Sequence, residues 1–322
     1  MPKIVALAAL QPLSAVDRVA FRTRNDPQAR QAHFMQYNIK ASTYNEDYCR
    51  RYGEEYFRYL EGWLLRAAER GVEFLLLPEL AFDPGVISAP VPEIPVNPHF
   101  FADALRLYRW AEDYFLTQLA RITDQTGMMI GASISSVRDE RLYNAGIIVD
   151  GGAPIFRYEK VHLAPSEEED YFTAGETFPV AETRLGRFGY NICYDIQFPE
   201  AFACCAAAGA EVVLHPSLGY TLPDEDPDMG CNRLRVRASD HYCAVIYSSF
   251  AQDRGWRPGY SRVIAQNGSV LAALSARKSG IAIGQVEIGR KRRWPSDSAD
   301  APDRKQFVRQ RRRPTTYGPL TQ

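Results

Sequence analysis

Cys193 stands where the chain is expected to turn from a strand into a helix. The strand is the short, glycine-bounded segment 188–192, and the helix starts near Pro199 and continues through an alanine-rich stretch. A thiol at such a turn can attack a substrate at the edge of a sheet, and the following backbone N–H groups, including that of Tyr194, can bind an oxyanion. The alternative interpretation is a buried structural cysteine.

Glu79 and Lys160 also follow predicted strands. Glu79 comes after the apolar run 74–77 and Pro78, so its carboxylate is expected just past the carboxyl end of a buried strand, where α/β sheets bind ligands. Lys160 follows residues 155–159. A carboxylate beside a thiol can accept its proton, and an ammonium group favours the thiolate. Each residue also has a purely structural interpretation, in which Glu79 caps the next segment and Lys160 is an exposed surface lysine.

The elements that must position these side chains are predicted to alternate between strands and helices, with some strands paired directly. Apolar positions at helical spacing predict helices over 52–71, 101–126 and 229–241. This pattern favours an α/β protein with a mixed sheet, or two stacked sheets, flanked by helices. Strands are predicted in the first ten residues and at 72–77, 128–135, 142–149, 155–161, 212–215, 243–250, 261–274 (a hairpin) and 281–286.

The chain is expected to form one domain over 1–289, followed by a basic tail. A polar, arginine-rich stretch at about 14–50 shows no clear period and is interpreted as an insertion or cap. The segment 290–322 is expected to pack on the body of the protein or on a neighbouring subunit.

The composition is that of a globular protein with a large core, since 46% of the 322 residues are hydrophobic and 24% are charged. A formal net charge of -1 provides no overall field for nucleic acid or an anionic membrane. No apolar stretch approaches the roughly 20 residues that a membrane helix needs. Six cysteines without C-x-x-C spacing indicate reduced thiols in a cytoplasmic protein. The five histidines lack metal-ligand spacing, so neither a metal nor a cofactor is predicted.

The segments around Glu79, Lys160 and Cys193 resemble the carbon-nitrogen hydrolase (nitrilase-like) superfamily, in its amidase and carbamoylase branch. The resemblance covers about residues 4–288, interrupted at 14–50, and the segments 209–217, 236–238 and 259–264 agree with it in order. It is carried by three motifs: Leu76-Leu77-Pro78-Glu79, then Glu159-Lys160-Val161-His162-Leu163 with Pro165, and Cys193-Tyr194-Asp195 with Phe198-Pro199-Glu200.

The resemblance implies a four-layer α-β-β-α sandwich of two mixed sheets flanked by helices, in a homodimer or a higher homo-oligomer. It implies that Cys193 is the nucleophile, Glu79 the general base and Lys160 the electrostatic partner of the thiolate and the oxyanion. The substrate would be a small amide or N-carbamoyl compound, which is cleaved through a cysteine thioester with release of ammonia.

Further site residues are expected on two loops. The family carries a second glutamate between the lysine and the cysteine, and alignment on Phe172 and Gly175 selects Glu168 within an acidic run that also contains Glu167. Such a run is alternatively a solvated loop. His215 and Ser217 follow a short strand and are expected to line the substrate pocket, although His215 also has an ordinary structural interpretation.

Four other functions compete with amide hydrolysis. Cys193 could pair with His162 or His215, as in cysteine proteases, but neither histidine has a motif of comparable specificity around it. The fold could serve as a binding module without turnover, although the intact Glu79, Lys160 and Cys193 argue against this. Nitrile hydrolysis is the alternative within the superfamily, followed by acyl transfer to another nucleophile.

Overall fold

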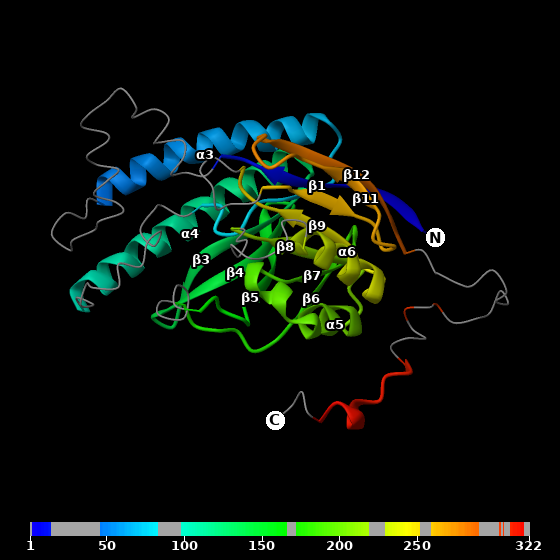
Figure 1. Ribbon diagram of the computed structural model, residues 1–322. Helices are drawn as coiled ribbons and strands as arrows, with labels where there is room; N and C mark the ends of the chain where they lie inside the picture. Colours follow the sequence, from blue (N-terminus) through cyan, green and yellow to red (C-terminus); the bar gives the residue numbers. More distant parts are fainter. Residues whose placement is uncertain are drawn as a thin grey trace.

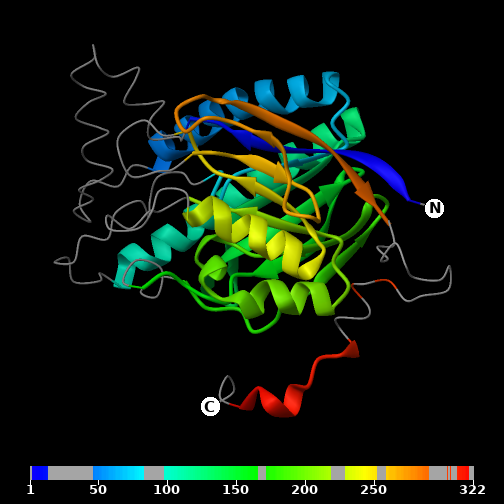
Figure 2. The ribbon, with the colours of Figure 1, turned by 45° about the vertical axis from the view of Figure 1, so that its right-hand side comes forward.

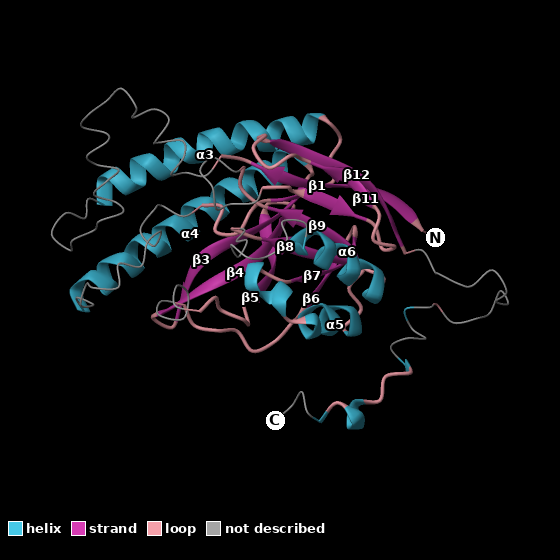
Figure 3. Ribbon diagram, viewed as in Figure 1, coloured by secondary structure: helices cyan, strands magenta, loops and turns pink. Residues whose placement is uncertain are grey.

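The computed structural model describes residues 2–13, 46–82, 98–165, 172–218, 229–251 and 259–289, together with 303, 305 and 310–318. In this part of the chain, two six-stranded mixed sheets stack face to face and carry helices on their outer faces (Figure 1). Colouring by secondary structure shows the strands enclosed between two layers of helix (Figure 3). The predicted α-β-β-α sandwich is therefore confirmed.

The first sheet has the strand order β12-β1-β2-β3-β4-β5. Its central strands β1, β2 and β3 are parallel, whereas β12, β4 and β5 pair antiparallel with their neighbours. Glu79 lies just past the carboxyl end of β2, and Lys160 directly follows β5. The bounds are β1 Lys3–Gln11, β2 Phe74–Leu76, β3 Met129–Arg138, β4 Arg141–Asp150, β5 Ala153–Glu159 and β12 Gly280–Ile288.

The second sheet has the strand order β11-β10-β9-β8-β7-β6. Here β7, β8 and β9 are parallel, so the residues that follow β7 and β8, including Cys193 and Ser217, are at the same edge of the sheet. The short edge strand β6 is not among the predicted elements. The bounds are β6 Val180–Thr183, β7 Gly186–Tyr190, β8 Val212–Pro216, β9 Ala244–Ser248, β10 Arg262–Ile264 and β11 Val270–Ala273.

Two pairs of helices cover the outer faces. The helices α3 (Glu46–Glu69) and α4 (Pro98–Thr126) pack on the first sheet, and α5 (Pro199–Ala207) and α6 (Met229–His241) pack on the second. The rotated view shows α5 and α6 together on the side of the sandwich away from α3 (Figure 2). Within the described residues, no helix combines the length and the apolar character needed to cross a membrane.

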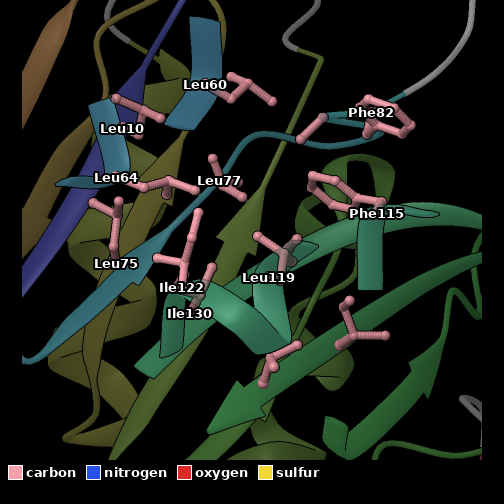
Figure 4. Close-up of a cluster of buried hydrophobic side chains, with 14 of the residues drawn as sticks. Leu10, Leu60, Leu64, Leu75, Leu77, Phe82, Phe115, Leu119, Ile122 and Ile130 are labelled. Carbon is pink, nitrogen blue, oxygen red and sulfur yellow. The ribbon is translucent and has the colours of Figure 1, made fainter. Parts of the chain in front are cut away.

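The strand β2 shows why a nearly continuous apolar run belongs at the centre of this fold. Leu75 and the following Leu77 point into the cluster beneath α3 and α4, which Figure 4 shows in close-up. Phe74 and Leu76 point into the layer between the two sheets, where the ring of Phe74 stacks on Phe188 of β7 at 4.8 Å. A strand buried on both faces needs apolar residues at successive positions, and this fixes where Glu79 emerges.

Tyr190, the last residue of β7, ties the second sheet to the first. Its hydroxyl donates to the carbonyl oxygen of Ile147 at 2.7 Å and reaches that of Ala132 at 3.2 Å. The ring occupies space that Gly146 leaves open, because a Cβ atom at Gly146 would lie 2.5 Å from Tyr190 Cδ1. This contact fixes the end of β7 only three residues before Cys193.

The substitution Gly146→Ala is expected to destabilise the protein by about 1–3 kcal/mol, because the added methyl group overpacks the layer between the sheets. Urea unfolding measures the change. Gly62→Ala is the control, since a Cβ atom there would be 3.8 Å from its nearest neighbour, the flexible end of Arg66. That change in the middle of α3 should stabilise the helix by about 0.5–1 kcal/mol. Equal effects of the two substitutions would contradict the packing argument.

Two predicted segments fall largely outside the described residues. Of the insertion predicted at 14–50, residues 46–50 form the start of α3, and 14–45 are not described. In the tail predicted at 290–322, Pro314–Thr316 form a short 3-10 helix, and Lys305 Nζ donates to the carbonyl oxygen of Ala210 beside β8. The domain division itself stays a prediction.

Candidate active site

Glu79 is fully buried, and its carboxylate accepts hydrogen bonds from Lys160, Asn144 and Leu218. Its Oε1 atom accepts from Lys160 Nζ at 2.9 Å and from Asn144 Nδ2 at 2.8 Å. Its Oε2 atom accepts from the backbone N–H of Leu218 at 2.7 Å. Hydrogen bonds of this kind stabilise the charged carboxylate. The carboxylate therefore lies between β4, β5 and the segment that follows β8.

Lys160 is 1% exposed and forms a buried ion pair with Glu79. Its backbone is fixed on both sides, since its N–H donates to the carbonyl oxygen of Asn144 and its carbonyl oxygen accepts from Gly175. Gly175 has no space for a side chain, because a Cβ atom would lie 2.2 Å from the carbonyl oxygen of Glu159. The interpretation of Lys160 as an exposed surface lysine is therefore wrong.

Asn144 on β4 is a site residue that the sequence analysis missed. Its amide donates to Glu79, its side-chain oxygen accepts from Ser133 Oγ at 2.7 Å, and its carbonyl oxygen accepts from Lys160 N. The hydroxyl of Ser133 in turn accepts from the N–H of Leu80. A buried asparagine inside an otherwise apolar strand was the available signal, because such a group needs hydrogen-bond partners.

Cys193 has φ of +44°, in the left-handed region that non-glycine residues rarely adopt. It is half-buried and starts the 3-10 turn Cys193–Gln197, which ends where Pro199 begins α5. Such a backbone conformation costs of order 1–3 kcal/mol and persists only where the surrounding structure holds it. The structure therefore places a thiol at a constrained strand-to-helix turn, as the sequence predicts.

Cys193 and Lys160 each affect the pKa of one ring in a stacked pair formed by Tyr247 and His215. Burial, and to a smaller extent Cys193, raises the pKa of Tyr247 on β9. The ring of Tyr247 stacks on that of His215 with centroids 5.8 Å apart. Burial, with a smaller contribution from the Lys160 ammonium, lowers the pKa of His215 to about 4 against the opposing effects of Asp195 and a backbone hydrogen bond. Cys193 and Lys160 thus act on two stacked rings of one buried region.

The two histidines considered as partners of Cys193 have other contacts in the structure. The ring of His162 donates from Nδ1 to the carboxylate of Asp195 at 2.7 Å and stacks on Phe198. His215 is 1% exposed and donates from Nδ1 to the carbonyl oxygen of Asn191 at 3.1 Å. These contacts favour structural roles for both rings over a cysteine-histidine pair. That His215 lines the substrate pocket stays a prediction.

His215 is expected to make the protein less stable in mild acid. Its pKa of about 4 in the folded protein lies below the ordinary value of 6.5, so the unfolded chain binds the proton first as the pH falls. Its contribution is complete above pH 6.5 and is lost as the pH falls through 4, with a loss of about 2 kcal/mol between pH 7 and pH 5.

Urea unfolding at these two pH values measures this loss. The control variant His215→Asn keeps an N–H for Asn191 but does not titrate, so its stability should fall by about 2 kcal/mol less than that of the wild type. The same pH dependence in both proteins would contradict the assignment.

The remaining predicted site residues are placed as follows. The N–H of Ser217 donates to the carbonyl oxygen of Ser248 at 2.9 Å, and Ser217 directly precedes the residue that donates to Glu79. The ring of Tyr194 meets that of Phe198 edge-on at 5.8 Å. Glu168 lies outside the described residues, as does Glu167. Within the described part of the chain, no group of three acidic, histidine or cysteine side chains could hold a metal ion.

The sequence is similar to those of several enzymes of known activity. The N-carbamoylputrescine amidase of Solanum tuberosum is 24% identical over 192 residues, which cover 54% of this chain and 64% of the relative. A nitrilase of Pyrococcus abyssi is 26% identical over 230 residues, which cover 71% of this chain and 82% of the relative. The chain spans between half and two thirds of the length of several curated relatives that it matches.

A solved structure agrees over nearly the whole chain. It is a mutant amidase from Nesterenkonia sp. AN1, in which the acetamide moiety of fluoroacetamide is covalently added at the active-site cysteine. At 20% identity the TM-score is 0.66, and the match covers 98% of this chain and 95% of the amidase, which supports the same fold. The family model for carbon-nitrogen hydrolases matches residues 28–296, which is well over half of the sequence. The chain therefore belongs to the carbon-nitrogen hydrolase family.

Proposed function

We propose that this protein hydrolyses a small amide or N-carbamoyl compound through a thioester on Cys193, with release of ammonia. The observations that carry the proposal are the buried Lys160–Glu79 ion pair, 2.9 Å long, and the thiol of Cys193 on a strained strand-to-helix turn. A fully buried lysine and glutamate are costly to maintain for stability alone, because desolvation offsets most of their attraction. The retention of such a pair supports a catalytic site.

In the first half of the reaction, Glu79 accepts the thiol proton while Cys193 Sγ bonds to the substrate carbonyl carbon. The negative charge that develops on the carbonyl oxygen is stabilised by the Lys160 ammonium and by the N–H of Tyr194. The carbon–nitrogen bond then breaks, the nitrogen takes the proton from Glu79, and ammonia leaves a thioester behind.

In the second half, water attacks the thioester carbon and gives a proton to Glu79. The carbon–sulfur bond breaks, the acid is released, and the proton returns to the sulfur. We assign Glu168 as the second glutamate of the site, and His215 and Ser217 as residues that border the substrate. The fixed Oε1 and Oε2 contacts of Glu79 support its use in both halves, because the carboxylate needs no rearrangement between them.

The amide and carbamoyl classes are favoured over nitriles by the sequence at the nucleophile. Cys193-Tyr194-Asp195 resembles the amidase and carbamoylase branch, whereas true nitrilases usually have Trp-Glu or Gly-Glu after the cysteine. The amidase and the N-carbamoylputrescine amidase among the similar proteins support the same choice. The match to a nitrilase keeps nitrile hydrolysis as the second candidate.

A substrate panel read out as ammonia release tests the proposal. It contains aliphatic amides, N-carbamoyl amino acids, carbamoyl amines and nitriles, each with wild type and with Cys193→Ala. We expect turnover of at least one amide or carbamoyl compound that is lost in the variant. A response to nitriles alone would replace amide hydrolysis by nitrile hydrolysis, and equal rates in the two proteins would favour a binding module.

We further propose that the chain works as a homodimer or higher homo-oligomer in the cytoplasm. The basis for this is the family resemblance and the reduced-thiol composition. Light scattering of the purified full chain tests the assembly, with a monomer at micromolar concentration as the contradicting result.

A further inference from the structure

The two segments that carry Lys160 and Cys193 are joined by a second ionisable pair. His162 follows Lys160 by two positions, and Asp195 follows Cys193 by two positions. His162 Nδ1 donates to Asp195 Oδ1 at 2.7 Å, and the backbone N–H of His162 donates to the same oxygen at 3.1 Å. The His162–Asp195 pair therefore connects the lysine segment to the nucleophile turn.

The second oxygen of Asp195, Oδ2, accepts hydrogen bonds from both segments. It accepts from the hydroxyl of Tyr158 at 2.6 Å and from the N–H of Ile192 at 2.8 Å. Tyr158 lies on β5, two residues before Lys160, and Ile192 is bonded directly to Cys193. The Tyr158 hydroxyl also accepts from the N–H of Val161 at 3.1 Å.

Burial makes this arrangement costly to disturb. Asp195 is fully buried, so its carboxylate depends on its four donors in place of water. Burial and the negative charge of Asp195 raise the pKa of Tyr158 well above its ordinary value, which keeps the donated proton on the phenol. On the opposite side of His162, Phe198 stacks on the ring with centroids 3.7 Å apart. The turn thus contacts His162 through both a hydrogen bond and a ring.

We propose that Asp195 and His162 are positioning residues that hold the sulfur of Cys193 and the ammonium of Lys160 at their working separation. Asp195 fixes Ile192, and with it the left-handed conformation of Cys193, while His162 and Tyr158 fix the segment that contains Lys160. This inference rests on the proposed role of Cys193 as the nucleophile. It assigns His162 a role through Asp195 and no proton transfer with the substrate.

Removing the His162 ring is expected to lower the reactivity of Cys193 for two reasons. The lysine segment loses one of its hydrogen bonds to the turn, and the negative charge of Asp195, two residues from Cys193, loses one of its four donors. Both changes disfavour the thiolate, which is the reactive form of cysteine.

The test measures the rate at which iodoacetamide alkylates each cysteine at pH 7, by peptide mass spectrometry. Cys204 is exposed on α5 and serves as a reference within the same chain. In His162→Ala, Cys193 should react about tenfold more slowly than in the wild type, and the rate of Cys204 should not change.

The rescue variant is His162→Asn, whose side-chain amide can place an N–H near the position of Nδ1. We expect it to recover most of the Cys193 rate. Tyr158→Phe removes a single donor and should slow Cys193 by about threefold, and it serves as the second variant if His162→Ala does not fold. With a substrate from the panel, His162→Ala and Tyr158→Phe should lower kcat and leave KM nearly unchanged, and His162→Asn should recover most of kcat.

Three results would overturn this proposal. The first is a wild-type Cys193 rate in both His162→Ala and Tyr158→Phe. The second is a His162→Asn protein that folds normally but reacts as slowly as His162→Ala, which would mean that the imidazole itself activates the thiol. The third is a wild-type Cys193 no more reactive than Cys204, which would overturn the proposed function as well. Absence of turnover with every panel substrate would overturn the proposed function alone, because alkylation requires no substrate.

Discussion

Replacing Cys193 by alanine is expected to lower the rate of ammonia release on the order of 10⁴-fold or more. In the proposed mechanism the thioester forms on this sulfur, so both halves of the reaction should be lost together. Cys193→Ser should be nearly as inactive, because a hydroxyl is a much weaker nucleophile than a thiol when it is not deprotonated. The measurement is kcat/KM for the best substrate of the panel.

The matched control for this prediction is Cys204→Ala on α5. Cys204 is exposed, and its loss should leave kcat/KM within about twofold of the wild type, as surface substitutions have small effects. Urea unfolding should place Cys193→Ala within about 1 kcal/mol of the wild type, since only a half-buried sulfur is removed. An alanine variant that keeps a tenth of the activity would show that Cys193 is not the nucleophile.

Replacing Lys160 by methionine is expected to affect stability and activity together. The substitution keeps most of the apolar volume but leaves the Glu79 carboxylate buried beside Asn144 without its positive partner. Loss of one member of a buried ion pair costs about 3–5 kcal/mol. Activity should fall at least about a hundredfold, because the oxyanion loses its positive neighbour.

A second substitution separates the two effects of Lys160. The double variant Lys160→Met with Glu79→Gln carries no buried charge at the pair, so it should regain much of the lost stability while activity stays absent. Lys278→Met is the control for loss of a lysine, since Lys278 is exposed. The account would be contradicted if Lys160→Met were as stable and as active as the control.

The parts of the fold that the sequence predicts well are those with strong apolar periodicity. The helix predicted over 229–241 coincides with α6, and the run at 74–77 marks β2 and therefore the position of Glu79. The start of α3 was missed, because residues 46–50 are polar and belong to the arginine-rich stretch. The edge strand β6 was missed because its four residues, of which only Ala181 is buried, carry too little periodicity.

The sequence predicted those residues of the candidate site whose side chains are nucleophilic or charged and which follow a predicted strand. Cys193, Glu79 and Lys160 can be recognised from their residue types and their neighbours in the sequence. The contacts of Asn144 and Asp195 arise only when distant segments pack together in the fold. Asn144 contacts a carboxylate 65 positions away, and Asp195 contacts a histidine 33 positions away. Such contacts depend on strand register and on the conformation of the turn, which local sequence patterns do not fix.

The central claim is that turnover passes through an acyl group on the sulfur of Cys193. The most direct measurement is mass spectrometry of the Glu79→Gln protein, quenched in acid after mixing with the p-nitrophenyl ester of the acid that the best amide substrate yields. Glu79 serves both halves of the proposed reaction, but a nitrophenolate leaves without taking a proton, so loss of the carboxylate should slow the attack of water more than the formation of the thioester. The acyl group should therefore accumulate on the peptide that contains Cys193. Two results would contradict the account. One is an active wild-type protein whose variant shows no acyl group on the Cys193 peptide, and the other is an acyl group on a different residue.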